Sequence, residues 1–538
     1  MSKSNEVLNL DVAIIGAGFS GMYMLHRLRD MLKLKARVFE AADDVGGTWY
    51  WNRYPGARCD SESYYYSYSF SGELEQEWDW SSRYPGQPEI LKYLTHVADR
   101  FDLKKDIQFN TWIEGLHFDE ANNRWILSTE KGEKISAQFV VTAVGCLSAR
   151  NTPDFAGLDS FQGDWYHTGA WPHEAVDFAG KRVGLIGTGS TGIQATPVIA
   201  AEAEHLTIFQ RTPNFSVPAR NAPLDPQTAA EIKANYAEIR AQCRESSGGF
   251  PFLPIERLAK DVSHEEREKI YSELWQQGGF RFIAESFADL LTDQEANDTA
   301  ADFIREKIRE TVKDQEVATK LLPTNHPYAT KRPPIDTDYF ETFNRDNVKL
   351  VDVRESPIEE ITARGVRTGD NEYDLDILVF ATGFDAMTGP LLAMDIKGVA
   401  GKPLREAWEA GPRSYLGLQV AGFPNLFTIT GPGSPSVLTN MPVAIEQHVE
   451  WITDCIAYLR EHGLTRIEAQ EAAQEEWVQH VSEEANDTLY PKANSWYVGA
   501  NVPGKSRVFM PYVGGMEVYR QHCDEIAAKD YEGFALSD

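Results

Sequence analysis

The sequence predicts an α/β fold of two similar lobes, with a helical insertion in the second lobe. A strand–turn–helix–strand pattern over residues 12–40 returns over residues 183–209, which indicates two lobes of the same design. Residues 222–330 lack strand-like alternation and are rich in Glu, Ala, Lys and Arg, which favours helices. At roughly 100–200 residues per domain, a chain of 538 residues has room for about three domains.

The first lobe contains a glycine turn between a strand and a helix. An apolar run from Val12 reaches the turn Gly16-x-Gly18-x-x-Gly21, and apolar residues at helical spacing follow it. Gly16 permits a tight turn, Gly18 lets the backbone approach a pyrophosphate, and Gly21 lets the helix pack on the strand. Glu40 ends the next strand, where a carboxylate accepts hydrogen bonds from ribose hydroxyls. This order predicts a Rossmann-like dinucleotide site.

The second lobe repeats the turn as Gly187-x-Gly189-x-x-Gly192, but its next strand ends in Gln210-Arg211-Thr212 instead of an acid. A carboxylate would repel a 2′-phosphate, whereas a guanidinium can bind it through two hydrogen bonds. We therefore expect NADPH rather than NADH in this lobe. The alternative is that Arg211 is a solvated surface charge. The other residues expected at this nucleotide are Thr188, Ser190, Thr191 and Gln194.

Two dinucleotide sites in one chain suit hydride transfer from a nicotinamide to a second redox group. The first site is followed by Gly46-Gly47-Thr48-Trp49 and suits FAD. A flavin can accept a hydride and then react with O2 by one-electron steps, which no side chain can do. We expect Gly47, Thr48, Trp49 and Tyr66 to contact the FAD.

The helical insertion shows start and stop signals of its own. Ser263 with Glu266 predicts a capped helix start, and Gly278-Gly279 predicts the end of that helix. The glycine and proline cluster 246–254 is expected to be a loop. One helical face is expected to contain Ile232, Tyr236, Ile239 and Cys243.

Composition argues against several partners. The chain has 81 Asp and Glu against 52 Lys and Arg, and its net charge of −29 repels nucleic acid and anionic membranes. No apolar run approaches the ~18–20 residues that span a bilayer, and Met1–Leu10 lacks the apolar core of a signal peptide. Five widely spaced cysteines without CxxC argue against a disulfide framework or a metal site. We expect a cytoplasmic monomer that binds no metal, nucleic acid or membrane.

Two longer motifs carry a family resemblance. The first combines Phe161, Gly163, His167 and Trp171, followed by Pro172, in the spacing FxGxxxHxxxW. The second combines Gly46-Gly47-x-Trp49, Tyr54-Pro55-Gly56 and Asp60. With these motifs, and over nearly its whole length, the chain resembles the Baeyer–Villiger monooxygenases. It is most similar to the subgroup of phenylacetone and steroid monooxygenases, whose pattern is seen in the segments 52–60 and 431–436.

The resemblance implies a reaction as well as a fold. NADPH would reduce FAD, O2 would form a C4a-peroxyflavin anion, and this anion would attack a hydrophobic ketone to give an ester or lactone, NADP+ and water. Sulfoxidation would be a side activity. By resemblance, Arg332 stabilises the peroxide and the later adduct, because a guanidinium stays protonated across the working pH range. Asp60 is the carboxylate that holds this guanidinium in place.

The resemblance also assigns residues around the second cofactor and the ketone. Lys331 would join Arg211 and Thr212 at the 2′-phosphate, and Trp496 would bond the NADP ribose from a mobile loop. His167 would couple domain movement to catalysis. Leu438 and Met441 would border the ketone. The plainer alternatives are core packing for Trp496, Leu438 and Met441, and a packing or hinge role for His167 and Trp171.

The expected domains follow from this interpretation. We expect an FAD-binding domain of residues 1–150 plus 388–538, an NADP-binding domain of residues 151–221 plus 331–387, and the helical insertion of residues 222–330. The nearest alternative function is a flavin-containing N- or S-monooxygenase, which has a related FxGxxxH motif but lacks the pair Asp60 and Arg332. A non-catalytic nucleotide-binding redox sensor is the alternative from another class.

Overall fold

The larger sheet is organised around a buried parallel strand, β1. The computed structural model describes residues 7–252, 255–369 and 371–538. The eight strands of this sheet have the order β17-β4-β5-β6-β1-β2-β3, and β18 pairs with β6 outside this path. They are β1 (Leu8–Ile15), β2 (Ala36–Phe39), β3 (Ile107–Gln108), β4 (Ile113–Asp119), β5 (Arg124–Thr129), β6 (Lys134–Thr142), β17 (Asp395–Lys397) and β18 (Leu426–Thr428). The chain after residue 388 thus returns to the sheet in which it began.

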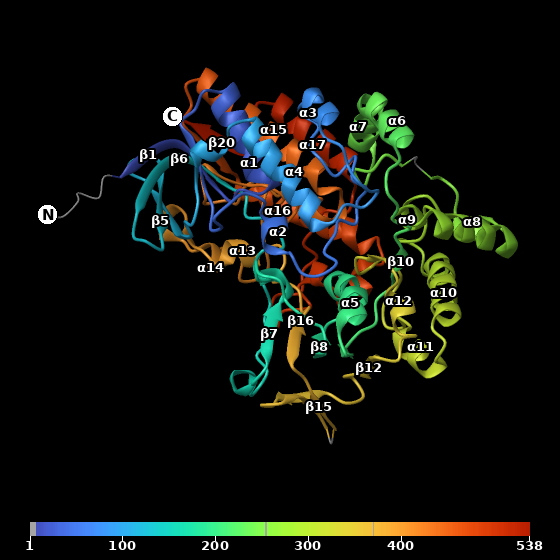
Figure 1. Cartoon of the computed structure of the whole chain (residues 1–538). Coiled ribbons are helices and arrows are strands. Elements are labelled where there is room, and N and C mark those ends of the chain that lie inside the picture. Colours follow the sequence, from blue (N-terminus) through green and yellow to red (C-terminus); the bar gives the residue numbers. More distant parts are fainter. Residues whose placement is uncertain (1–6, 253–254, 370) are drawn as a thin grey trace.

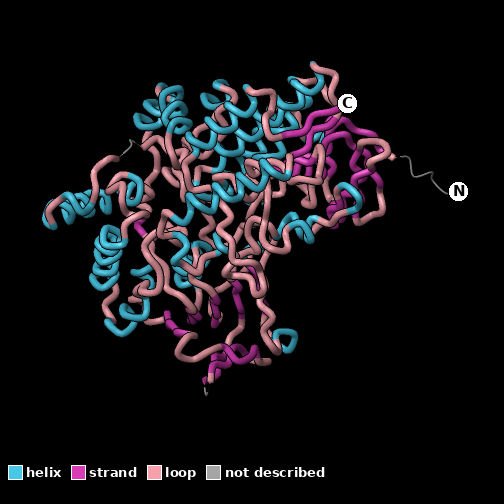
Figure 2. The backbone as a smooth tube through the Cα atoms, turned by 180° about the vertical axis from the view of Figure 1, so that it is seen from behind, coloured by secondary structure: helices cyan, strands magenta, loops and turns pink. Residues whose placement is uncertain are grey.

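The second sheet has five parallel strands in the order β12-β9-β8-β16-β7. They are β7 (Asp164–His167), β8 (Arg182–Ile186), β9 (His205–Gln210), β12 (Val348–Asp352) and β16 (Ile377–Phe380). Its central strands are apolar along their length because helices or loops cover both faces of a parallel sheet. Figure 2 shows the two sheets as separate groups of strands at opposite ends of the molecule. The expected α/β fold is confirmed.

Short strands complete the sheet structure. A three-stranded antiparallel sheet extends the second lobe, and two two-stranded pairs lie elsewhere. These strands are β13 (Ile358–Ile361), β14 (Gly365–Thr368) and β15 (Asn371–Asp374), then β10 (Val217–Pro218) with β11 (Ile335–Asp336), and β19 (Arg466–Ala469) with β20 (Phe534–Ser537).

Helices cover the first sheet and form the insertion. In Figure 1, α1, α4, α15 and α17 lie together over the larger sheet, while α8, α10 and α11 lie at the side of the second lobe. In the part of the chain that the structure describes, every helix is too short or too polar to cross a lipid bilayer. The main helices are α1 (Phe19–His26), α2 (Thr48–Trp51), α3 (Gly72–Glu77), α4 (Gln87–Arg100), α5 (Ser190–Glu202), α6 (Pro226–Ala234), α7 (Tyr236–Glu245), α8 (His264–Gln277), α9 (Arg281–Ala284), α10 (Gln294–Thr311), α11 (Gln315–Leu321), α12 (Tyr339–Thr342), α13 (Gly389–Leu392), α14 (Leu404–Ala407), α15 (Met441–Glu461), α16 (Glu471–Asn486) and α17 (Met516–Ala528).

The insertion confirms most of its expected signals and corrects one. The Ser263 hydroxyl accepts from the Glu266 N–H at the start of α8, and Gly278 ends that helix with φ +72°. The loop from residue 246 is confirmed up to residue 252, while its last residues, 253–254, lie outside the described residues. The single helical face expected from Ile232 to Cys243 is wrong, because the helix breaks at Asn235. The Asn235 side chain donates to the Glu231 carbonyl, competing with helical backbone bonding.

Prediction for the second glycine turn: Gly192→Ala lowers the free energy of unfolding by about 1–3 kcal/mol, the usual cost of overpacking. A Cβ at Gly192 would lie 2.2 Å from the Gly187 carbonyl oxygen, where helix α5 packs on the strand. Urea unfolding followed by circular dichroism measures the change. Gly189→Ala is the matched control, because a Cβ there meets nothing within 4 Å. If both variants were equally stable, the proposed role of close packing at Gly192 would be wrong.

Candidate functional site

The first glycine turn forms a surface without side chains. Gly16 has φ +102°, and a Cβ at Gly21 would lie only 1.8 Å from the Gly16 carbonyl oxygen. A Cβ at Gly47 would lie 2.8 Å from the Gly18 Cα, so the two glycine segments abut. Bare backbone at the start of α1 offers N–H groups and the positive end of a helix dipole. These features fit the pyrophosphate of a dinucleotide.

Glu40 lies at the edge of this turn, just after β2. Its side chain is buried, and its two oxygens accept from the N–H groups of Ala17 and Ala42 at 2.6 and 2.8 Å. Burial raises the pKa of Glu40, and these backbone N–H groups oppose that rise. The carboxylate is thus held beside the first residue after Gly16, as a ribose acceptor requires.

The residues expected beside the flavin surround the second glycine segment. Thr48 is exposed at the start of α2, and the Trp49 indole donates to the Tyr66 hydroxyl at 3.2 Å. Tyr66 also packs edge-on against Phe19 at 5.4 Å between ring centroids. The aromatic side chains of Trp49, Tyr66 and Phe19 next to the bare glycine backbone suit the binding of a planar ring such as a flavin.

The second glycine turn leaves an open backbone surface. Gly187 has φ +111°, and a Cβ at Gly189 would meet nothing within 4 Å. The buried Thr188 hydroxyl donates to the Thr212 carbonyl at 2.8 Å, which ties the turn to the end of β9. Ser190 and Thr191 begin helix α5 and are half-buried. This surface fits a second dinucleotide.

Two cations lie near the end of β9. Arg211 is exposed and Lys331 is half-buried. Burial lowers the pKa of Lys331, and the neighbouring charge of Arg211 lowers it further. An anion such as a phosphate would relieve the repulsion between these two cations. Gln210 instead points inward, where its amide donates to the Lys320 carbonyl at 2.8 Å.

Arg332 and Asp60 form an ion pair between the two lobes. Arg332 Nε donates to Asp60 Oδ2 at 3.1 Å, and Nη1 donates to the Val437 carbonyl at 2.9 Å. Burial opposes the charge of Arg332, yet the Asp60 carboxylate raises its pKa above the usual value. Burial raises the pKa of Asp60, and Arg332 opposes that rise. Tyr497 also contacts Arg332: burial raises the pKa of Tyr497, and Arg332 opposes that rise through its charge and a side-chain hydrogen bond. A guanidinium has five N–H donors, so at least two remain after these three contacts among the described residues.

Gln194 connects the second glycine turn to the Asp60 segment. From helix α5, its amide nitrogen donates to the Arg58 carbonyl at 3.2 Å and to Asp60 Oδ1 at 3.4 Å. Its amide oxygen accepts from the Tyr54 hydroxyl at 2.8 Å. Helix α5, which follows the second glycine turn, is therefore bonded to the Asp60 carboxylate that holds Arg332.

His167 lies beside Asn151 and Thr382, on the two segments by which the chain passes between the lobes. Its Nδ1 accepts from the Gly169 N–H at 3.0 Å, and its Nε2 lies 3.3 Å from the Asn151 carbonyl. The Thr382 hydroxyl donates to that same carbonyl at 2.6 Å. Burial lowers the pKa of His167, so the ring is neutral at pH 7 and Nε2 is its donor. These contacts with Asn151, Gly169 and Thr382 fit a hinge residue.

The other motif residues pack. Phe161 and Trp171 are buried, and Trp171 packs against Tyr166 at 5.3 Å between ring centroids. A Cβ at Gly163 would lie 2.3 Å from the Asp376 carbonyl oxygen, next to the start of β16. The sequence motif therefore shapes the edge of the second sheet.

Trp496 shares one apolar cluster with the residues expected at the ketone. The cluster includes Leu438, Met441, Cys146 and the buried Tyr497. The loop that follows Trp496 is bonded to the segment after Thr382, because Lys505 Nζ lies 2.5 Å from Asp385 Oδ1. Since the Val437 carbonyl bonds Arg332, this cluster borders the guanidinium.

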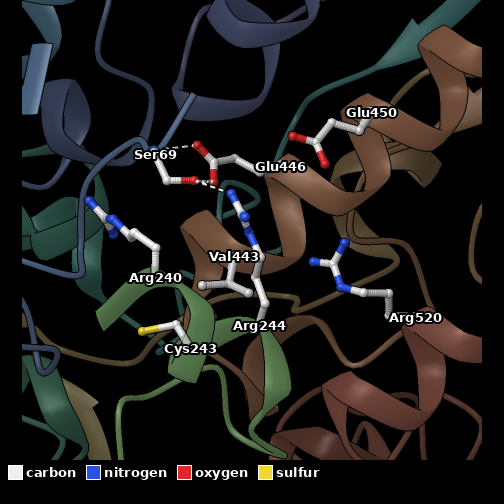
Figure 3. Close-up of a pocket in the computed structure, with 8 residues that line it drawn as sticks. All are labelled: Ser69, Arg240, Cys243, Arg244, Val443, Glu446, Glu450 and Arg520. Atoms are coloured by element: carbon white, nitrogen blue, oxygen red, sulfur yellow. Dashed lines mark hydrogen bonds between the residues drawn. The ribbon is translucent and has the colours of Figure 1, made fainter. Parts of the chain in front are cut away.

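A separate charged cavity lies between α7, α15 and α17 (Figure 3). Its volume of about 10 Å³ has room for about one water molecule. Arg244 donates to the Ser69 hydroxyl, which in turn donates to the buried carboxylate of Glu446. None of the residues expected at the cofactors or the ketone lines this cavity, and its ion network fastens the insertion to the first lobe.

Sequence reasoning missed three groups that contact Arg332. They are the Val437 carbonyl, the Tyr497 side chain, and Phe280, whose ring centroid lies 5.1 Å from the guanidinium carbon. Only the Gly278-Gly279 pair could have signalled a special backbone position before Phe280.

Two glycine turns of the dinucleotide-binding kind in one chain are typical of a two-cofactor oxidoreductase, and comparison with known proteins agrees. Residues 9–220 match the flavin-binding monooxygenase-like family. A Baeyer–Villiger monooxygenase of Pseudooceanicola batsensis is 47% identical over 98% of this chain and 95% of its own. A phenazine N-monooxygenase of Lysobacter antibioticus is 47% identical over 99% of this chain and 98% of its own.

Solved structures match over the same length. An oxidised steroid monooxygenase bound to NADP is 53% identical, with a TM-score of 0.94 over 98% of this chain and 99% of its own. The complex of the protein named OTEMO with FAD and NADP is 42% identical, with a TM-score of 0.95 over 98% and 99%. The chain belongs to the Baeyer–Villiger monooxygenases, as the sequence motifs predicted.

Prediction for the hinge: the free energy of unfolding of the wild type falls more between pH 7 and pH 5 than that of His167→Gln. The pKa of His167 lies below its usual value, so the unfolded state binds more protons below about pH 6.5, and the stability contributed by the neutral ring is lost as the pH falls. Urea unfolding at three pH values gives both slopes. Equal slopes would mean that His167 titrates alike in both states.

Proposed function

We propose that the protein inserts one atom of O2 next to the carbonyl of a hydrophobic ketone, giving an ester or lactone, NADP+ and water, with FAD and NADPH as cofactors. The observation that carries this proposal is the half-buried Arg332, held by Asp60, which Gln194 of the helix after the second glycine turn also bonds. The names of the related enzymes supply the reaction class. The bonds of Arg332 supply its physical basis.

The two lobes provide one cradle for each cofactor. The surface of Gly16, Gly18 and Gly21 with Glu40 would hold the FAD, and Trp49 lies in the wall beside it. The second nucleotide would contact the residues Gly187, Thr188, Gly189, Ser190, Thr191, Gly192, Arg211, Thr212 and Lys331. When bound, FAD accepts a hydride from NADPH and activates O2.

The chain's own residues would control charge and water. Arg332 places a permanent positive charge where negative charge develops on oxygen, and at least two N–H donors remain for that oxygen. Asp60 keeps the guanidinium in one orientation. The apolar cluster of Trp496, Leu438 and Met441 would exclude water and favour a hydrophobic ketone.

Gln210 and Gln194 need a revised assignment. We propose that Gln210 supports the second lobe from its core, because its amide bonds the Lys320 carbonyl. Gln194 would act on the active centre through Asp60, with its backbone near the nucleotide. The domain boundaries at residues 150, 221, 330 and 387, a monomeric state and a cytoplasmic location remain parts of this proposal.

A second candidate function is N-oxidation of a flat heteroaromatic amine, with sulfoxidation as a related side activity. The observation that favours it is the phenazine N-monooxygenase that is 47% identical to this chain. An oxygen donor that attacks a carbonyl can also transfer oxygen to nitrogen or sulfur. Mass spectrometry of products from a ketone, a sulfide and a phenazine separates ester, sulfoxide and N-oxide.

Prediction for the charge: Arg332→Ala lowers ester formation at least about a hundredfold, the usual loss when a group stabilising developing negative charge is removed. NADPH still reduces the bound flavin, because the glycine turns and Arg211 are untouched. Gas chromatography measures the ester, and absorbance measures NADPH. Arg364→Ala is the control, since that arginine is 65% exposed and pairs with Glu372. Normal ester formation by Arg332→Ala would refute the proposed role.

Prediction for the second nucleotide: Arg211→Ala raises the KM for NADPH about tenfold or more and leaves the KM for NADH within twofold. The lost guanidinium–phosphate bonds correspond to about 1.5–3 kcal/mol. Steady-state kinetics with both nucleotides measure the ratio. Arg220→Ala, which removes an exposed arginine, serves as the control. A parallel rise for NADH would contradict recognition of the 2′-phosphate.

A further inference from the structure

The helical insertion reaches Arg332 through one aromatic side chain. The Phe280 ring is 8% exposed, and its centroid lies 5.1 Å from the Arg332 guanidinium carbon. Arg332 therefore contacts four separate parts of the chain, namely Asp60 in the first lobe, Val437 before α15, Tyr497 after α16, and Phe280 in the insertion.

The backbone before Phe280 is held in a conformation that only glycine adopts readily. Gly278 and Gly279 have φ +72° and +70°. A Cβ at Gly279 would lie 2.0 Å from the Tyr84 hydroxyl oxygen, and one at Gly278 would lie 2.5 Å from the Pro218 carbonyl oxygen. The Gly279 N–H also donates to the Pro218 carbonyl at 2.9 Å. The turn is therefore packed against Tyr84 of the first lobe and Pro218 of the second, and this sets the position of Phe280.

Phe280 also packs against a second aromatic ring. Its ring centroid lies 5.5 Å from that of Phe250, in the loop of residues 246–252. This loop accepts a hydrogen bond at Gly248 from the Asn440 N–H at 2.8 Å, just before helix α15. Phe280 thus contacts both the Arg332 guanidinium and the loop of residues 246–252. That loop in turn contacts the segment that contains Leu438 and Met441.

The N–H groups of a guanidinium lie in its plane, so hydrogen bonds hold its edge and leave its faces open. Asp60 and Val437 accept such bonds from Arg332, whereas Phe280 contacts the guanidinium through its ring. A ring against the cation attracts it through the ring quadrupole and keeps water from that face. We propose that Phe280 is a positioning residue that orients Arg332, so that the helical insertion completes the active site. This inference rests on the proposed role of Arg332.

The test compares two substitutions at residue 280. Phe280→Leu keeps an apolar side chain but removes the ring, and it lowers the ester formed per NADPH oxidised about three- to thirtyfold, the range of a partly buried cation–π contact. The KM for NADPH stays within twofold, because the second glycine turn is unchanged. Phe280→Tyr keeps the ring and retains at least half of the wild-type yield.

Phe282→Leu is the matched control. Phe282 is fully buried two residues further on, and it packs against Tyr271, Phe303 and Tyr328 instead of Arg332. If Phe280 only filled space, Phe282→Leu would lower the ester yield per NADPH as much as Phe280→Leu. We expect Phe282→Leu to lower the thermal midpoint while leaving the yield per NADPH within twofold of the wild type.

A double-substitution cycle gives a readout that needs no turnover. Urea unfolding of the wild type, Phe280→Leu, Arg332→Ala and the double variant yields the coupling between the two side chains. We expect a coupling of about two- to thirtyfold in the folding equilibrium constant. Phe280→Met replaces Phe280→Leu in the cycle if the leucine variant does not fold.

The outcomes separate the two proposals. Equal yields from the wild type and Phe280→Leu, equal losses for Phe280→Leu and Phe280→Tyr, or no coupling to Arg332 would each overturn the role of Phe280. A wild type that converts no ketone would instead overturn the proposed function, whatever the variants do.

Discussion

The ion pair of Arg332 with Asp60 is the constraint around which the site is arranged. The two residues are 272 positions apart, and their 3.1 Å contact requires the first lobe and the segment after the insertion to meet. A half-buried guanidinium loses part of its hydration, so it needs hydrogen-bond acceptors from the protein. If it is also to bind a ligand, some of its N–H donors must stay unoccupied. Asp60, the Val437 carbonyl and Tyr497 engage three of its five donors, and at least two remain for a ligand.

The same pair links the cofactor surfaces to each other. Gln194 in helix α5 bonds Asp60 and Tyr54, so the helix that follows the second glycine turn contacts the carboxylate that orients Arg332. His167 joins the two segments that cross between the lobes at the Asn151 carbonyl. A movement of one lobe relative to the other would therefore move Asp60 and the segments of Asn151 and Thr382 together. This coupling is what a hinge role for His167 means.

Sequence patterns predicted features formed by neighbouring residues, such as the glycine turns. The family resemblance supplied contacts between residues far apart in the chain. The glycine turns were predictable because Gly16 and Gly187 require positive φ and Gly21 and Gly192 require close packing, and both demands show in residue type and spacing. The pairing of Asp60 with Arg332 joins distant segments, so no spacing rule could predict it. The break at Asn235 escaped the periodicity because apolar spacing continues across it while a side-chain amide interrupts the helix.

The part of the site that escaped the sequence is the contribution of the insertion. Phe280 is one of 26 phenylalanines, and nothing in its neighbours but two glycines marks it as different. Its position follows from tertiary contacts, namely Tyr84 and Pro218 against the glycine turn. An insertion that only covered the second lobe would not need an aromatic ring 5.1 Å from the guanidinium. Phe280 therefore makes the insertion a part of the active site, through which substitutions in α8 or α9 would reach Arg332.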